Sequence, residues 1–134
     1  MMDALETVYN VLKADSMINT EVGNRIKYYD YPATGDNFGP TIVLEEVDAP
    51  RPDDYADNQW LTDDFYVHIE VWVKGNGGRK KRDAIAYRIR QLMWDKLGFH
   101  HESSMKPEWD KDTNTYRDAR RYRGKVYRND LDTL

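Results

Sequence analysis

The chain of 134 residues contains no cysteine, which excludes disulfide scaffolds and metal sites built from thiolates. No run reaches the roughly 18 consecutive apolar residues that a membrane-spanning helix needs. Asp3 and Glu6 lie where the charged-then-apolar pattern of a secretion signal would start. These absences predict a single soluble domain, residues 1–134, that folds in a reducing cytoplasm.

Sequence patterns that carry catalysis are also missing. Gly75-Asn76-Gly77-Gly78 precedes a predicted helix, but neither GK[ST] nor GxGxxG follows it, and no serine lies in a nucleophile-elbow sequence. The neighbouring residues His100 and His101 would point to opposite faces of a strand, so they could not share one metal ion there.

Asp63, Asp64, Glu70 and Lys74 suggest a metal-dependent nuclease at first sight. Such enzymes need an acid followed by Glu-x-Lys on one strand, whereas Glu70 and Lys74 are separated by about 13 Å along a strand. That distance is too long for both to serve one metal-bound water. We therefore predict that the protein is not an enzyme and has no catalytic residues, no cofactor and no metal site.

The clearest structural signal is the segment 64–97. Its first ten residues alternate strictly, with apolar residues from Phe65 to Val73 on one face, which predicts a long strand. After the glycine turn the period changes to that of a helix, because Ile85, Ile89 and Leu92 share one stripe.

The other segments extend this unit. Asp3 predicts the cap of a first helix, strands are expected at 25–31 and 41–47, and weaker strand signals occur at 99–109 and 116–128, the last exposed or at an edge. We therefore predict the α+β class, with a largely antiparallel sheet of four to five strands and two helices packed on it.

Residues 48–63 are expected to form a long, mobile acidic loop. Five aspartates and two prolines occur there with a single arginine, Arg51, and such a composition disfavours packing. Residues 129–134 are expected to form a flexible tail.

Charge is distributed unevenly along the chain. Residues 1–74 hold 5 Lys and Arg against 15 Asp and Glu, a net charge of −10, whereas residues 75–134 hold 15 against 9, a net charge of +6. This split fits either a solvated charged surface or copies that meet acidic face to basic face.

The basic run Arg79–Arg82 opens the predicted second helix, where cations are unfavourable. It could be solvated and partly offset by Asp83, or it could bind nucleic acid or an acidic segment of a neighbour. On the same helix, Tyr87 and Trp94 are seven residues apart on the face opposite the apolar stripe, with Arg90 nearby. Either a terminal segment covers them or they anchor an interface.

The candidate interface residues combine the acidic segment, the basic segments and these aromatics. They are Asp53, Asp54, Asp57, Trp60, Arg79, Lys80, Lys81, Arg82, Tyr87, Arg90, Trp94, Arg120, Arg121 and Arg123.

Several of these stretches resemble the small tail-completion, or tail-to-head joining, proteins of long-tailed bacteriophages, which are related to tail terminators. The resemblance rests on ALETVYNVLKAD, VGNRI, PTIVLEEV, YVHIEVWVKG and RDAIAYRIRQLMWDKL, and covers roughly residues 4–97. The last third departs from it, since YRDARRYRGKVYR is rich in arginine where the family has an apolar alternating strand.

The resemblance implies a non-enzymatic virion assembly protein. Such proteins act as rings, generally hexameric, that cap the tail tube and join it to the head connector. The implied partners are copies of the chain itself, the tail-tube protein and a head-completion protein, while DNA passes through without specific binding. A small nucleic-acid-binding module that uses the basic C-terminal half is the alternative.

Overall fold

A six-stranded sheet forms the centre of the molecule in the computed structural model, which describes residues 2–33 and 37–131. Its strands are β1 (Ile26–Tyr28), β2 (Thr41–Ala56), β3 (Gln59–Lys74), β4 (His100–Ser104), β5 (Glu108–Asp110) and β6 (Thr115–Tyr127). The strand order is β1-β2-β3-β6-β4, and β5 pairs with β6. Of the strand pairs in the described residues, β1–β2 is parallel and the others are antiparallel.

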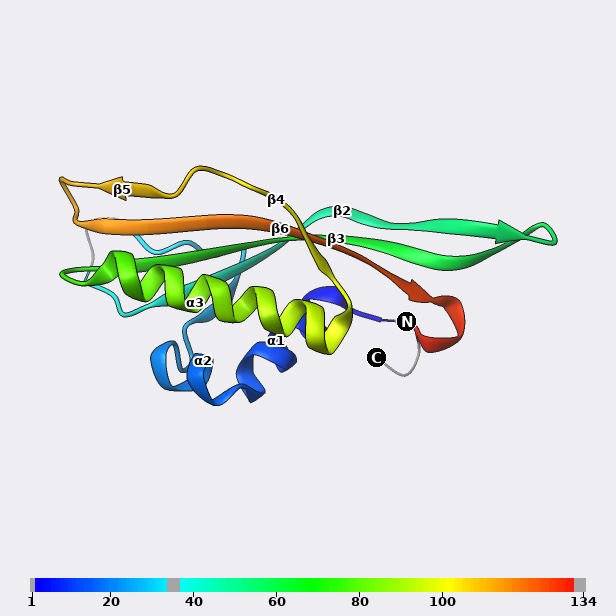
Figure 1. Cartoon of the computed structure of the whole chain (residues 1–134), viewed down its shortest axis with the longest axis horizontal. Coiled ribbons are helices and arrows are strands. Elements are labelled where there is room, and N and C mark those ends of the chain that lie inside the picture. The colour runs from blue at the N-terminus through cyan, green and yellow to red at the C-terminus, as the bar shows by residue number, and fades with distance from the viewer. Residues whose placement is uncertain (1, 34–36, 132–134) are drawn as a thin grey trace.

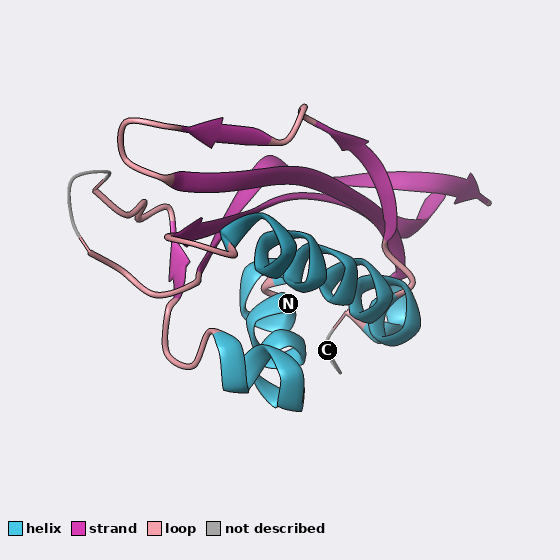
Figure 2. Ribbon diagram, turned by 60° about the vertical axis from the view of Figure 1, so that its left-hand side comes forward, coloured by secondary structure: helices cyan, strands magenta, loops and turns pink. Residues whose placement is uncertain are grey.

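All the helices lie on one side of this sheet (Figures 1 and 2). They are α1 (Ala4–Ala14), α2 (Ser16–Glu21) and α3 (Gly78–Leu92), which continues as the π-helical turn η1 (Met93–Leu97); the 3₁₀ turn η2 (Arg128–Asp130) follows β6. The predicted α+β class is confirmed, with one short helix and at least one strand more than expected. None of the described helices is long and apolar enough to cross a membrane.

The predicted strand–turn–helix unit forms the core. The inward side chains of β3, from Phe65 to Val73, are at most 2% exposed, and the α3 residues Ile85, Ile89 and Leu92 pack against them. Val8 and Leu12 of α1 close the same core from below the sheet. The alternation and the helical stripe of the sequence therefore mark the two faces that exclude water.

Two aspartates cap the first two helices, α1 and α2. The Asp3 carboxylate accepts a hydrogen bond from the Glu6 amide at 3.1 Å, as the sequence predicts, and Asp15 accepts one from the Ile18 amide. Arg88 of α3 also donates to Asp15 at 2.7 Å. This hydrogen bond from Arg88 lowers the pKa of Asp15 and joins α3 to the α1–α2 corner.

The prediction of a mobile acidic loop at 48–63 is wrong. These residues continue β2 and β3 into an antiparallel hairpin that projects at one end of the molecule's longest axis (Figure 1). Residues 62–64 of β3 still pair with β6, and the hairpin is two-stranded beyond them. We call its distal part, residues 51–64, the arm.

The backbone explains why this polar, proline-containing segment forms strands. Asp57 and Asn58 join Ala56 to Gln59 and have φ of 51° and 63°, the positive values that a two-residue type I′ turn requires and that Asp and Asn tolerate. Because β1 pairs with β2 only through Leu44, Pro52 lies on an open strand edge, where a missing N–H is tolerated.

Two further expectations fail at the C-terminal end. β6 is an interior strand between β3 and the β4–β5 edge, and not an edge strand. Of the expected flexible tail 129–134, Asn129 and Asp130 lie in η2 and Leu131 is buried in the core at 7% exposure; residues 132–134 lie outside the described part of the chain.

Candidate interaction surfaces

The arm carries the four acidic-segment candidates, but they do not form one surface. Asp53 and Asp54 both pair with Lys125 of β6, at 3.2 and 3.0 Å. Trp60 packs against the core with the Arg128 guanidinium 5.0 Å from its ring centroid. Only Asp57, at the turn, is exposed and forms no ion pair within the described residues.

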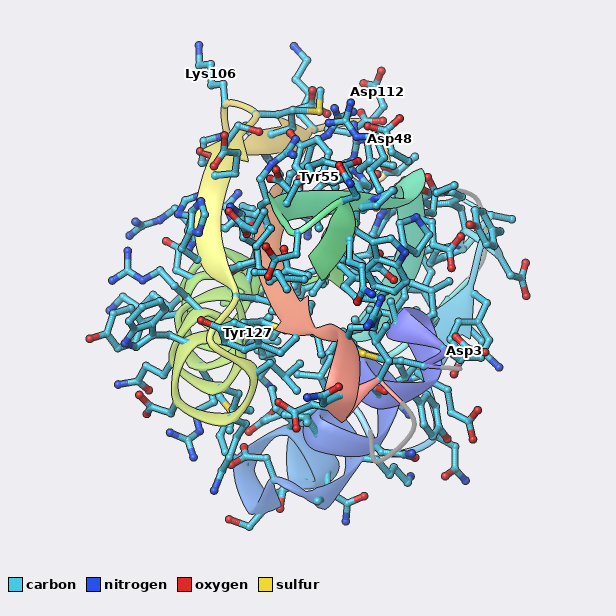
Figure 3. All side chains as sticks on the ribbon, turned by 90° about the vertical axis from the view of Figure 1, so that its right-hand side faces the viewer. Asp3, Asp48, Tyr55, Lys106, Asp112 and Tyr127 are labelled. Carbon is cyan, nitrogen blue, oxygen red and sulfur yellow. The ribbon has the colours of Figure 1, made fainter. Side chains whose placement is uncertain are left out.

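Exposed apolar groups accompany Asp57 at the end of the arm. Tyr55 is 68% exposed and Leu61 41% exposed; Figure 3 views the molecule from this end and labels Tyr55 there. We define the arm tip as Tyr55, Asp57 and Leu61. It combines one uncompensated carboxylate with two uncovered apolar side chains.

The four residues of the basic run at the start of α3 differ in exposure and in their ion pairs. Arg79 and Lys80 are exposed and pair with no carboxylate in the described chain, whereas Lys81 pairs with Glu21 at 3.2 Å. Arg82 is only 6% exposed: it contacts Asp83 at 3.0 Å and donates to the Glu108 carbonyl at 3.1 Å. Arg82, a candidate interface residue in the sequence, is therefore buried within the fold, whereas Arg79 and Lys80 are exposed.

Arg82 packs against a pair of stacked aromatic rings that the sequence did not predict. Its guanidinium lies 5.7 Å from the centroid of Tyr116, and the Tyr116 ring stacks on Trp109 at 6.0 Å. Trp109 remains 56% exposed beside Lys106 and Lys111. We define Arg79, Lys80, Lys106, Trp109 and Lys111 as the basic end. The signal in the sequence is weak, because Trp109 lies in a short polar stretch.

The arm tip and the basic end lie at opposite ends of the longest axis. In Figure 1 the arm points to the right, whereas β5 and the start of α3 lie at the left. The structure therefore does not bring the acidic segment and the 79–82 run together within one copy.

Most arginines of β6 form ion pairs with carboxylates of β3 or of β6 itself. Arg120 pairs with Asp118 at 3.1 Å and Arg123 with Asp64 at 2.6 Å. Arg121 is exposed, with its guanidinium 5.9 Å from the centroid of Tyr66. These residues alternate faces, so Arg121 and Arg123 lie on the side without helices and Arg120 on the helix side.

The face of the sheet without helices contains a buried polar cluster that the sequence did not reveal. Glu70 is 3% exposed and accepts hydrogen bonds from His68 at 2.7 Å, Trp72 at 3.0 Å and Arg117 at 3.1 Å. Burial alone would raise the pKa of Glu70, but these donors outweigh it and lower the pKa to about 2. The cluster joins β3 to β6 and is internally satisfied at Glu70, as expected for a structural group.

Tyr87, Arg90 and Trp94 form the exposed helix face that the sequence predicts. Tyr87 is 51% and Trp94 61% exposed, and the Arg90 guanidinium lies 4.9 Å from the Tyr87 ring centroid. No terminal segment within the described residues covers them. Trp94 also borders an open groove of about 370 Å³ that reaches His100 and His101 on β4.

The described residues contain no group of three His, Asp or Glu side chains that could hold a metal ion. His100 contacts Glu102 at 2.6 Å, and His101 contacts the Ser103 carbonyl at 3.1 Å. Two of the acids that suggested a nuclease form ion pairs with different arginines: Asp64 pairs with Arg123, and Glu70 pairs with Arg117.

The sequence matches no family model, and a search of curated proteins finds no significant match. The fold does match a chain in the solved structure titled "Virion of native gene transfer agent (GTA) particle". That alignment has a TM-score of 0.66 and 18% sequence identity, and covers 90% of this chain and 91% of that chain. The two chains are therefore similar in fold over nearly their whole lengths.

Proposed function

We propose that this protein is a structural subunit of a phage-like virion, located at the neck or tail end, and that it does not catalyse a reaction. The observation that carries the proposal is the near full-length fold similarity to a chain of a virion particle. The residues that resemble tail-completion proteins support the same class independently, because they come from the sequence alone.

More specifically, the chain acts as a ring, most simply a hexamer, that caps the tail tube and joins it to the head connector. A closed ring needs two different, complementary surfaces on each copy. The arm tip and the basic end satisfy this requirement, and their separation along the longest axis suits a head-to-tail contact. The ring assembles in the host cytoplasm, and DNA passes through it without specific binding.

The nucleic-acid alternative is weakened for β6 by the ion pairs of that strand, which leaves Arg79, Lys80, Lys106 and Lys111 of the basic end as the cations without an ion pair that such a site could use. Arg117, Arg120, Arg123 and Lys125 all contact carboxylates of the same chain. Phosphate binding would have to displace these partners, whereas nucleic-acid sites present uncompensated cations. Heparin retention at moderate salt, falling steeply as salt rises, would support the alternative instead.

The direct test is a joining assay. Heads and tails purified from particles that lack this protein are mixed with and without it, and joined particles are counted by negative-stain electron microscopy. The proposal expects joining only with the protein. Equal numbers of joined particles in both mixtures would contradict it.

A further inference from the structure

We infer that the arm tip of one copy docks on the basic end of the next copy, which makes this the contact that closes the ring. The inference rests on the proposed ring and identifies its interface. The partner at this interface is a second copy of this chain. One copy contributes the three-residue arm tip and the other the five-residue basic end, both defined above.

Charge is the first argument. Asp57 is the arm-tip carboxylate without a cationic partner in the described chain, and Arg79 and Lys80 are exposed cations without a carboxylate partner there. Nearby, Lys125 pairs with Asp53 and Asp54, and Glu21 pairs with Lys81. Arg51 in the arm, and Asp110 and Asp112 beside the basic end, are exposed and form no ion pair in the described chain. The four cations of the basic end outnumber Asp110 and Asp112 beside it, so its net charge is positive, whereas the arm tip carries only the Asp57 carboxylate. Opposite net charges favour a head-to-tail encounter over a tip-to-tip one.

Apolar surface is the second argument. Trp109 is held flat on Tyr116, yet more than half of it is exposed. At the arm tip Tyr55 offers an exposed aromatic ring, and Leu61 offers apolar surface on the opposite face of the hairpin, because Tyr55 pairs with Trp60. Exposed, rigid aromatic rings are typical anchors at the centres of protein interfaces, and the cations around Trp109 would lie in the polar rim.

Open strand edges are the third argument. Among the described strands, none pairs with the outer side of β2 along the arm, because β1 reaches only to Leu44. Within the described part of the chain β5 pairs with β6 alone, so its other side is an edge as well. Exposed edges readily pair with other strands, and a two-stranded ribbon is marginal in water without further contacts. Docking would stabilise both.

Cross-linking tests the contact, because the natural chain has no cysteine. Ala56→Cys places one thiol beside the arm tip, Lys80→Cys one at the basic end, and Gln91→Cys one beside the Trp94 groove. Single-cysteine proteins are mixed pairwise at high concentration and low salt and treated with a short bismaleimide. The expected result is covalent dimers from the Ala56→Cys and Lys80→Cys mixture, and few from either protein alone.

Two outcomes would overturn the inference while leaving the proposed ring intact. In the first, light scattering shows that the proteins associate, but the Ala56→Cys protein cross-links to the Gln91→Cys protein and not to the Lys80→Cys protein. The other is cross-linking of Ala56→Cys to itself, which indicates a symmetric tip-to-tip contact. A chain that stays monomeric both alone and on tail tubes would contradict the ring itself.

A charge exchange provides the second measurement. Asp57→Lys alone and Lys80→Asp alone should each weaken association about fivefold, since one surface ion pair contributes up to about that factor. The mixture of the two variants should recover most of the loss. Equal weakening in the mixture would overturn the pairing, and Lys27→Asp, at an exposed site on β1, serves as the matched control.

Discussion

Arg117 of β6 donates hydrogen bonds to both carboxylate oxygens of Glu70 on β3, one of them at 3.1 Å. Glu70 is almost fully buried, whereas the Arg117 side chain is 26% exposed. This pair, with His68 and Trp72, crosses the two central strands on the face that no helix covers. It replaces the apolar packing that the opposite face uses.

Removal of the Glu70 carboxylate should therefore lower the free energy of unfolding more than removal of an exposed carboxylate that contacts the same arginine, Arg117. Glu70→Ala leaves Arg117, His68 and Trp72 without their acceptor, and we expect a loss of about 3 kcal/mol in the free energy of unfolding. Glu108→Ala, which removes the exposed carboxylate 3.1 Å from Arg117, should cost under about 1 kcal/mol. Urea denaturation of both variants checks this; equal losses would contradict the account.

The same carboxylate predicts a pH dependence. The pKa of Glu70 in the folded protein is about 2, below its ordinary value of 4.5. Ionised Glu70 therefore stabilises the fold fully above pH 4.5, and this contribution disappears as the pH falls from about 4.5 to about 2. The stability difference between the natural protein and Glu70→Gln should shrink across this window. A difference that stays constant there would exclude Glu70 as its source.

Gly124 is predicted to tolerate no side chain. A Cβ at this position would lie 2.2 Å from the Phe99 ring, which is buried and stacked on Phe65. Gly124→Ala should cost about 1–3 kcal/mol by overpacking. Gly98→Ala is the control, because its φ of 68° costs about 1–2 kcal/mol although no atom lies within 4 Å. A Gly124→Ala protein as stable as the natural one would disprove the close packing.

The arm should respond to its turn residues. Asn58 has a positive φ that glycine adopts at no cost and valine resists. Asn58→Gly should slow amide hydrogen exchange in residues 51–64, and Asn58→Val should accelerate it, with core amides unchanged in both. Identical exchange in the two variants would mean that this turn does not set the arm's stability.

Trp94 should matter for assembly and not for folding. It is 61% exposed, so Trp94→Ala should change the free energy of unfolding by under about 0.5 kcal/mol but abolish joining of tails to heads. Trp60→Ala is the control, because Trp60 packs on the core and its loss should lower stability. Loss of folded circular dichroism in Trp94→Ala would place Trp94 in the core.

The sequence predicts the β3–α3 unit well because periodicity reports which faces are buried. The alternation from Phe65 to Val73 and the spacing of Ile85 and Ile89 survive in the structure unchanged. The sequence did not predict the strands of the arm, because they are stabilised by the Asp57–Asn58 turn and by an ion pair with Lys125 of a distant strand. Neither of these contacts requires an alternating apolar pattern in the sequence.

The candidate sites were predicted only in part, because composition cannot reveal pairing. Arg123 looks like Arg79 in sequence, yet the fold brings Asp64 of β3 beside it. Arg82 and Arg120 pair with Asp83 and Asp118, which are close in sequence, but the sequence does not show that these pairs form. The exposed pair Tyr87 and Trp94 was predictable, since helical geometry alone places both residues opposite the buried stripe.

The ring at the tail end can be tested most directly with tail tubes assembled from the accompanying tube protein. The tubes are sedimented with excess protein, and the bound copies are counted per tube. We expect a fixed, saturating stoichiometry of about six copies, or about 95 kDa for chains of 15.9 kDa, visible as a ring at one end. Protein that stays in the supernatant, or that coats the tube along its length without saturating, would contradict the account.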